Sequence, residues 1–241
     1  MPRFFVPESS VGTDAITISG QDAFHIGRSL RMRVGDELTV CSGGKDHICK
    51  LAKISDELCV ADIVSVSEGS GEPGTRLTLY QAVPKGDKAE LIVQKAVELG
   101  AAEICFVDTH RCVSRPDGKS WEKKMKRYER IALEAAKQCG RSAVPEVGGI
   151  IGFRECVKSL ENHEKGLMCY EKGGARLSHS LNGSEKDIGL LIGSEGGFEE
   201  SEAEAAKAAG VQLITLGSRI LRCETAPLAA ISVVMSIVGE I

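Results

Sequence analysis

The 241 residues of this chain predict an α/β protein with a parallel sheet, preceded by a small β-barrel. Beyond residue 76, apolar strand-like segments alternate with helical segments, as they do where helices connect parallel strands. Before residue 70, short β-branched segments separated by Gly and Asp turns favour a barrel or a sandwich. The segment EGSGEPG at 68–74 separates the two patterns and is rich in small, turn-forming residues. We therefore predict one domain over 1–72 and a second over 73–241.

The expected strands of the first domain are short and interrupted by one helical segment, Asp22–Leu30. These strands are Arg3–Val6, Ala15–Ile18, Glu37–Cys41, Ile48–Ile54 and Leu58–Val66.

The second domain is expected to alternate strands and helices, which indicates a parallel sheet. Its strands are predicted at Leu77–Val83, Glu103–Asp108, Gly166–Tyr170, Ile188–Ile192 and Gln212–Leu216. Its helices are predicted at Lys88–Leu99, Trp121–Cys139, Phe153–Asn162, Glu199–Ala209 and Leu228–Val238. The last helix is apolar but too short to span a bilayer, so it is expected in the core or in a subunit interface.

The composition argues against several classes of protein. A net charge of -4 argues against a uniformly basic nucleic-acid binder, although a local basic patch would suffice to contact RNA phosphates. The nine cysteines are scattered and contain no C-x-x-C pair, which favours reduced thiols in a cytoplasmic protein. His110 and Cys112 have no further potential ligands nearby, so we predict no metal site. Residues Met1–Val11 contain no long apolar run, and we expect neither a signal peptide nor a membrane partner.

The first turn of chemical interest is Gly193–Gly197, between a strand and a helix. Its glycines permit positive φ and close approach of the backbone to a ligand, although a tight turn alone would also need them. The spacing is neither G-x-G-x-x-G nor that of a P-loop. The next helix opens with Glu199, Glu200 and Glu202, which would repel a phosphate at its N-terminus. A neutral or cationic ligand held by backbone groups fits this turn better.

The second turn, 216–227, places Arg219, Arg222 and Glu224 between an apolar strand and an apolar helix. Charges in such a place are costly unless they are paired, so either an Arg–Glu pair ties the loop or the charges serve a ligand. Thr225 is predicted as the N-cap of the last helix, with Pro227 in its first turn.

Both turns resemble known signatures. GSEGGFEESE and LGSRILRCETAPLAA resemble the two motifs of the ribosomal RNA small subunit methyltransferase E family, which are SPOUT-type enzymes that methylate a uridine at N3. The usual forms are GPEGGF and LGxRILRTETA, so Ser194 and Cys223 depart from them. The segment HIGRSLRMRVGD resembles a stretch of the family's PUA-like domain, and EAAKQCGRSAVP resembles its EAAEQSGRxxVP motif.

The resemblance implies S-adenosylmethionine as cofactor, a C-terminal trefoil knot, a homodimer, and 16S rRNA of the small ribosomal subunit as substrate. It implies a cofactor site at Glu171, Gly193, Glu195, Gly196, Leu216, Ile220, Leu221, Thr225 and Ala226. Arg222 and Glu224 are the predicted catalytic residues, since loss of the N3 proton needs a base or a nearby cation. RNA contacts are predicted at Arg28, Arg31, Arg111, Arg115, Gln138 and Arg141. The alternatives are a non-catalytic RNA-binding protein, an NAD-linked enzyme, and a SPOUT methyltransferase that modifies another rRNA base or a tRNA.

Overall fold

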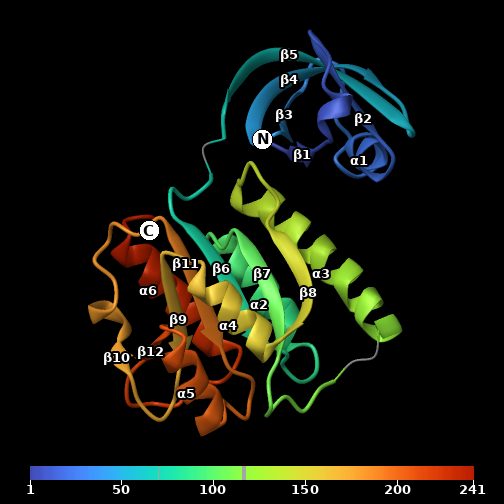
Figure 1. The fold of residues 1–241 in the computed structure, drawn as a ribbon. Coiled ribbons are helices and arrows are strands. Elements are labelled where there is room, and N and C mark those ends of the chain that lie inside the picture. Colours follow the sequence, from blue (N-terminus) through green and yellow to red (C-terminus); the bar gives the residue numbers. More distant parts are fainter. Residues whose placement is uncertain (70, 116–117) are drawn as a thin grey trace. The chain divides into compact units, whose positions relative to one another are not determined.

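The computed structural model describes residues 1–69, 71–115 and 118–241 (Figure 1). The predicted linker therefore includes one residue, 70, outside the described parts. The chain divides into two compact units. The first comprises Met1–Glu72 and Ala136–Val144, and the second comprises Pro73–Ala135 and Pro145–Ile241. The functional division at 1–72 and 73–241 stays a prediction.

The first unit is built on a curled five-stranded sheet of order β1-β3-β4-β5-β2. Only the β1–β3 pair is parallel among its described pairs. Alternate residues such as Ile16 and Ile18 of β2 are fully buried, which is the period expected of a sheet with one face on a core. The strands are β1 (Arg3–Phe5), β2 (Ala15–Ser19), β3 (Glu37–Ser42), β4 (Lys45–Ile54) and β5 (Leu58–Glu68). The helical segment consists of a short α1 (Gln21–Phe24) and a π-helical turn, His25–Ser29.

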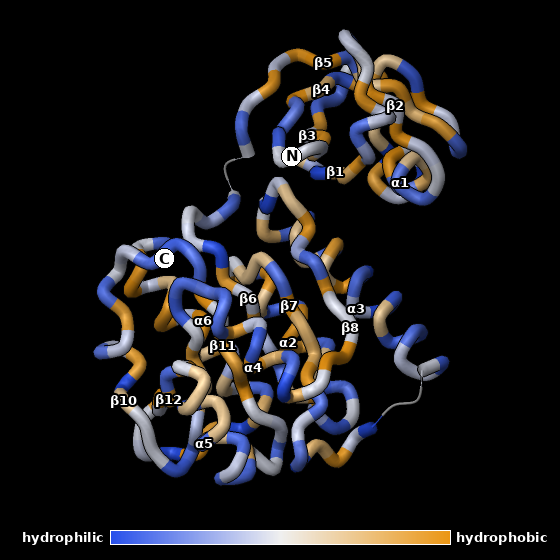
Figure 2. Tube along the Cα trace, viewed as in Figure 1, coloured by the Kyte–Doolittle hydropathy of each residue, from blue (hydrophilic) through white to orange (hydrophobic). Residues whose placement is uncertain are grey.

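The second unit contains a parallel seven-stranded sheet of order β10-β12-β9-β11-β6-β7-β8. Its central strands are buried almost throughout, as expected when helices cover both faces of a parallel sheet. β7 and β11 are mainly apolar in Figure 2. The strands are β6 (Arg76–Ala82), β7 (Glu103–Asp108), β8 (Glu146–Gly152), β9 (Lys165–Cys169), β10 (Ala175–Arg176), β11 (Asp187–Ile192) and β12 (Gln212–Thr215).

The helices of the second unit pack in two groups. α4 and α5 share one core with Tyr80, Met168 and Leu191 of the sheet, whereas α2 and α6 contact each other. Trp121 and Tyr128 of α3 pack on Phe106, whose side chain points to the opposite face from Cys105 and Val107 of the α4–α5 core. The helices are α2 (Lys88–Glu98), α3 (Gly118–Cys139, of which 136–139 belong to the first unit), α4 (Phe153–Glu161), α5 (Glu200–Ala208) and α6 (Thr225–Ile237).

The architecture confirms the predicted class, an α/β fold with a parallel sheet and a small β-rich unit. The knot stays a prediction. Three details were wrong or missed, one of them the short β10 (Ala175–Arg176), for which no strand was predicted. Thr225 is the first residue of α6 rather than its N-cap, because Glu224 already has helical φ and ψ and makes no capping hydrogen bond. β8 was missed because Gly148, Gly149 and Gly152 remove the β-branched pattern that marks a strand. None of the helices in the described ranges is long and apolar enough to cross a bilayer.

Candidate functional site

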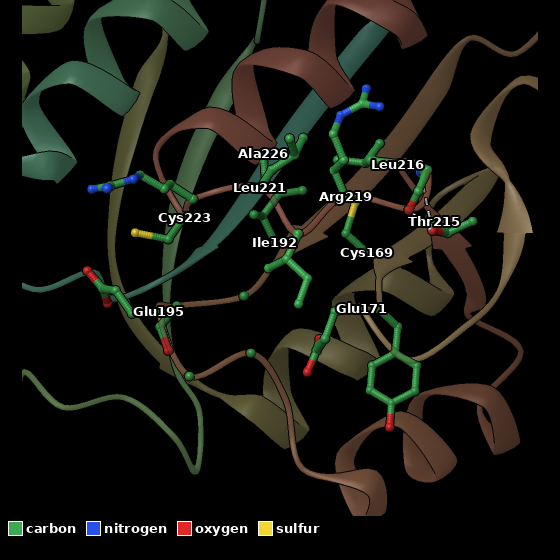
Figure 3. Close-up of a pocket in the computed structure, with 18 of the residues that line it drawn as sticks. Cys169, Glu171, Ile192, Glu195, Thr215, Leu216, Arg219, Leu221, Cys223 and Ala226 are labelled. Atoms are coloured by element: carbon green, nitrogen blue, oxygen red, sulfur yellow. Dashed lines mark hydrogen bonds between the residues drawn. The ribbon is translucent and has the colours of Figure 1, made fainter.

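The candidate site is a cavity of about 560 Å³ at the carboxyl ends of β9, β11 and β12 (Figure 3). Its volume lies within the range of about 300–1,000 Å³ that is typical of small-molecule and cofactor sites. Two loops form most of its wall: 193–197 after β11 and 216–223 before α6, here named the glycine loop and the arginine loop. The end of β9, Lys88 of α2 and Ala226 of α6 also line it. The cavity occupies the sheet edge at which open α/β proteins bind ligands.

The glycines of the glycine loop are required by close packing. A Cβ atom at Gly193 would lie 3.1 Å from the ring of Phe198. A Cβ atom at Gly196 would lie 2.9 Å from Cβ and 3.1 Å from the carbonyl oxygen of Arg111. Backbone cannot give way as the end of a long side chain can, so a larger residue at Gly196 would displace the loop.

Glu171, two residues beyond β9, closes the cavity on the side of the glycine loop. Its carboxylate lies against Gly197, where φ is +63° and where any side chain would collide with it. The cavity thus has a carboxylate in its wall, beside a glycine whose positive φ favours the absence of a side chain. Negative charge at this position favours a cationic ligand.

Arg111, in the loop after β7, anchors the glycine loop from one side. Its Nε donates to Glu199 at 2.9 Å, and its Nη1 donates to the carbonyl oxygen of Gly196 at 3.1 Å. The hydrogen bond to Glu199 raises the pKa of Arg111. Glu199 is the N-cap of α5 and forms a capping box with Glu202, which also accepts a hydrogen bond from the N–H of His110. One ion pair therefore joins the loop after β7 to the start of α5.

Lys88, the first residue of α2, holds the glycine loop from the other side. Its Nζ lies 2.8 Å from Glu195 Oε1 and 3.3 Å from Glu224 Oε2. The same nitrogen donates to Cys223 Sγ at 3.6 Å. Glu195 also accepts a hydrogen bond from the backbone N–H of Lys85 at 3.1 Å. A single ammonium group thus contacts the glycine loop, the arginine loop and the residue before α6.

These contacts set the protonation states around Lys88. Burial raises the pKa of Glu195, but hydrogen bonds from Lys88 and from backbone N–H groups outweigh it and lower that pKa to about 2. The hydrogen bond to Glu195 raises the pKa of Lys88. The pKa of Glu224 is lowered by a hydrogen bond from its own backbone N–H and by the side chains of Cys223 and Lys88. Burial raises the pKa of Cys223 to about 12. At neutral pH the cluster is one ammonium, two carboxylates and a neutral thiol.

The arginine loop is held by few side-chain contacts. The Thr215 hydroxyl donates to the carbonyl oxygen of Gly217 and accepts from its N–H, and φ of Gly217 is +108°. Ile220 is 85% exposed. Within the described residues, neither Arg219 nor Arg222 has an ion-pair partner, because Glu224 pairs with Lys88 instead. The Arg–Glu pair considered from the sequence is therefore not present.

The fold brings the predicted cofactor residues together, with one exception. All of them line the cavity except Thr225, which lies in the first turn of α6. Arg222 also lines the cavity, whereas Glu224 reaches it only through Lys88. Residues that the sequence prediction omitted include Lys88, Cys169, Tyr170, Ile192, Ser194, Gly197, Thr215, Arg219 and Cys223.

The predicted RNA-contacting residues are divided between the units. In the second unit, Arg111 is bonded to Glu199 and to the carbonyl oxygen of Gly196. Arg115 is exposed, with its Nε 4.0 Å from Asp108. In the first unit, Arg28 is exposed and paired with Asp56 at 2.6 Å. An RNA role for all six residues stays a prediction.

The other three predicted RNA-contacting residues, Arg31, Gln138 and Arg141, also lie in the first unit. Arg31 is exposed and has a positive φ of 52°, and Gln138 is exposed at the end of α3. Arg141 differs from them because its side chain is only 5% exposed and pairs with Glu72 at 2.5 Å. Contact with RNA would require Arg141 to leave that pair. Among the residues that the structure describes, no cluster of His, Cys, Asp and Glu could hold a metal ion.

Comparison with known proteins agrees with this geometry. Residues 71–235 match a model described as an RNA methyltransferase domain, and residues 18–64 match an RNA methyltransferase PUA domain. The chain is 31% identical to the ribosomal RNA small subunit methyltransferase E of Bacillus subtilis over 245 residues, covering 97% of this chain and 96% of that protein. This chain belongs to the ribosomal RNA small subunit methyltransferase E family. A family member from Mesomycoplasma hyopneumoniae is also 31% identical, with 94% of this chain and 95% of that protein covered.

Solved structures of similar proteins share the fold. The structure of the Neisseria gonorrhoeae family member, bound to S-adenosylmethionine, matches with a TM-score of 0.86 and 33% identity, covering 98% of this chain and 97% of that one. A Legionella pneumophila protein in complex with the cofactor S-adenosylmethionine matches with a TM-score of 0.87 and 29% identity, covering 97% and 96%. The larger unit of this chain is thus an RNA methyltransferase domain, preceded by a PUA domain.

Proposed function

We propose that this protein transfers a methyl group from S-adenosylmethionine to N3 of a uridine in the 16S rRNA of the small ribosomal subunit. The observation that carries the proposal is the cavity between the glycine and arginine loops, with carboxylates on one side and unpaired arginines on the other. Two solved relatives contain S-adenosylmethionine, and the names of the Neisseria gonorrhoeae and Bacillus subtilis relatives specify small-subunit rRNA.

The residues present fit this cofactor. Leu216, Leu221 and Ala226 offer apolar surface for an adenine ring, and the backbone of the arginine loop offers hydrogen-bonding groups for its edge. Glu171 carries a negative charge beside the cavity, which suits a sulfonium cation. The acidic start of α5 disfavours a nucleotide with a phosphate chain at the same place. When bound, S-adenosylmethionine supplies an activated methyl group on its positively charged sulfur.

Arg222 is the residue expected to act on the target base. It lines the cavity, and it has no ion-pair partner in the described chain. A fixed cation beside uracil stabilises the negative charge that appears when N3 loses its proton. Glu224 is less suited to remove that proton, because its lowered pKa makes it a weak base. We infer that Glu224 serves the reaction through its contact with Lys88.

The RNA is expected to contact both units. The 1–72 domain is proposed to bind RNA, consistent with its match to a PUA domain. On α3, Lys123, Lys126 and Arg130 are exposed and spaced along one face, as phosphate contacts require.

We also propose that the protein acts in the cytoplasm as a homodimer. Sedimentation at micromolar concentration tests the dimer, and a monomer there would contradict it.

Titration calorimetry with S-adenosylmethionine, followed by primer extension on small subunits from a strain lacking the gene, tests the function. Binding together with a new stop at an N3-methyluridine is the expected result. Binding without the stop would retain a methyltransferase but exclude this target, in favour of another rRNA base or a tRNA. Absence of binding would overturn the proposal and favour a non-catalytic RNA-binding protein.

A further inference from the structure

Lys88 has a contact pattern that its position in the sequence does not suggest. It is the first residue of α2, yet its ammonium contacts Glu195, which is 107 residues away, and Cys223, which is 135 residues away. An ammonium group has three N–H donors and no acceptor. The ammonium of Lys88 donates to Glu195 and Cys223, and Glu224 is a third partner in an ion pair at 3.3 Å. The ammonium group is therefore surrounded by two carboxylates and a thiol from distant parts of the chain.

The position of Lys88 matters because its partners repel each other. Glu195 and Glu224 both contact the same nitrogen, so their nearest oxygens lie within about 6 Å of each other, a range in which like charges destabilise one another. Their side chains are only 30% and 20% exposed, so water and salt screen the repulsion less than they do at a protein surface. Removal of the ammonium would therefore push the two loops apart.

The two partners belong to the two sides of the cavity. Glu195 lies in the glycine loop, whose opposite side is already fixed by Arg111. Cys223 lies at the end of the arginine loop, which has few other side-chain contacts, and Glu224 directly follows this loop. Lys88 is thus the contact that joins the arginine loop, with its few side-chain contacts, to the firmly held glycine loop.

We propose that Lys88 is a positioning residue that sets the spacing of the glycine and arginine loops and thereby shapes the cavity for its ligand. The proposal rests on the proposed function for the identity of that ligand. It assigns Lys88 neither a proton-transfer role nor a contact with the reacting atoms.

A purely electrostatic role predicts the opposite behaviour, which makes the proposal testable. Lys88 neutralises carboxylate charge near the cavity, so its loss would by charge alone strengthen binding of a cation. S-adenosylmethionine carries the sulfonium charge, and S-adenosylhomocysteine does not. If Lys88 positions the loops, Lys88→Met should raise the Kd values of both compounds by the same factor. If Lys88 acts by its charge, the ratio of the two Kd values should change.

The experiment is calorimetric titration of both compounds into the wild type, Lys88→Met, Lys88→Arg and Lys95→Met. Lys95 is a matched control, because it also pairs with a carboxylate on α2, Glu98 at 2.7 Å, but does not line the cavity. We expect Lys88→Met to raise both Kd values about tenfold, which exceeds the contribution of one surface ion pair. Lys88→Arg should restore most of the affinity, and Lys95→Met should leave both Kd values unchanged. Unchanged Kd values in Lys88→Met, or a change confined to one compound, would overturn the proposal.

Hydrogen exchange on the protein without ligand gives a second readout that does not depend on the proposed function. Lys88→Met should exchange faster than the wild type and Lys95→Met in both 193–197 and 216–223, while thermal unfolding verifies that each variant is folded. If both loops exchange at the same rate in Lys88→Met as in the wild type, the positioning role is refuted, even in a protein that fails to bind S-adenosylmethionine. If the wild type binds neither compound but exchange differs as expected, only the proposed function fails.

Discussion

The two loops of the cavity differ in how firmly the fold holds them. The glycine loop is enclosed by the backbone of Arg111, the carboxylate of Glu171 and two ion-paired cations. The arginine loop projects Ile220 into solvent and leaves its arginines without ion-pair partners in the described chain. A site that must bind a cofactor and still accept a large RNA needs both properties. The first loop is organised before the ligand arrives, and the second keeps its charges available.

The largest expected effect breaks the rigid loop itself. Gly196→Val should weaken binding of S-adenosylmethionine by about 100-fold or more, equal to about 3 kcal/mol, because its Cβ would meet Arg111 backbone and displace the loop. Calorimetry measures the change. Gly149→Val in β8 is a matched control, since no atom lies within 4 Å of the added Cβ. Wild-type affinity in Gly196→Val would remove the glycine loop from the site.

The second effect tests the open loop. Arg222→Ala should lower the methyl-transfer rate at saturating cofactor by about 100-fold to 1,000-fold, as loss of one charge-stabilising group does in other enzymes. The Kd of S-adenosylmethionine should change little, because the backbone and the carboxylates provide most of its contacts. Single-turnover assays together with calorimetry separate the two quantities. An unchanged rate would exclude Arg222 from catalysis.

A third effect distinguishes two roles for Arg111. If it mainly anchors the glycine loop, Arg111→Ala should raise the Kd of S-adenosylmethionine about fivefold, as expected for a part-buried ion pair with a backbone hydrogen bond. If it mainly contacts RNA, as predicted from the sequence, only the KM for the small subunit should rise. Measuring both constants on one preparation decides between them.

The smallest expected effect concerns pH. The pKa of Glu195 is lowered to about 2 in the folded protein, from an ordinary value near 4.5. A lowered folded pKa means that the stabilisation is fully present above about pH 4.5 and is lost as the pH falls toward about 2. Wild type and Glu195→Gln should therefore differ by a constant amount, no more than about 1 kcal/mol, between pH 8 and pH 5. Urea unfolding measures it, and a difference that shrinks between pH 8 and pH 6 would contradict the assignment.

Local sequence patterns predicted much of the fold and of the cavity wall. The alternation of strands and helices was sufficient for the parallel sheet, because burial on both faces and the helical crossovers leave strong periodic signals. The end of α2 was likewise readable: Gly100 has a φ of +93°, and the N–H of Ala101 bonds back to Ala96. The glycines of 193–197 indicated a ligand site formed by backbone groups, because few other residues tolerate such close packing. β8 was missed because its glycines carry no such signal.

The sequence by itself determined most of the strands, the positions of the two loops and part of the set of loop residues that line the cavity. Only the tertiary structure decided which charges meet. Lys88 and Glu195 are 107 residues apart, Arg111 and Glu199 are 88 apart, and Arg141 and Glu72 are 69 apart. Each of these residues has an ordinary local environment in the sequence, since charge pairing over such separations depends on strand order and on helix placement. Arg141 shows the consequence, because its burial against the Glu72 carboxylate could not be read from the residues around it in the sequence.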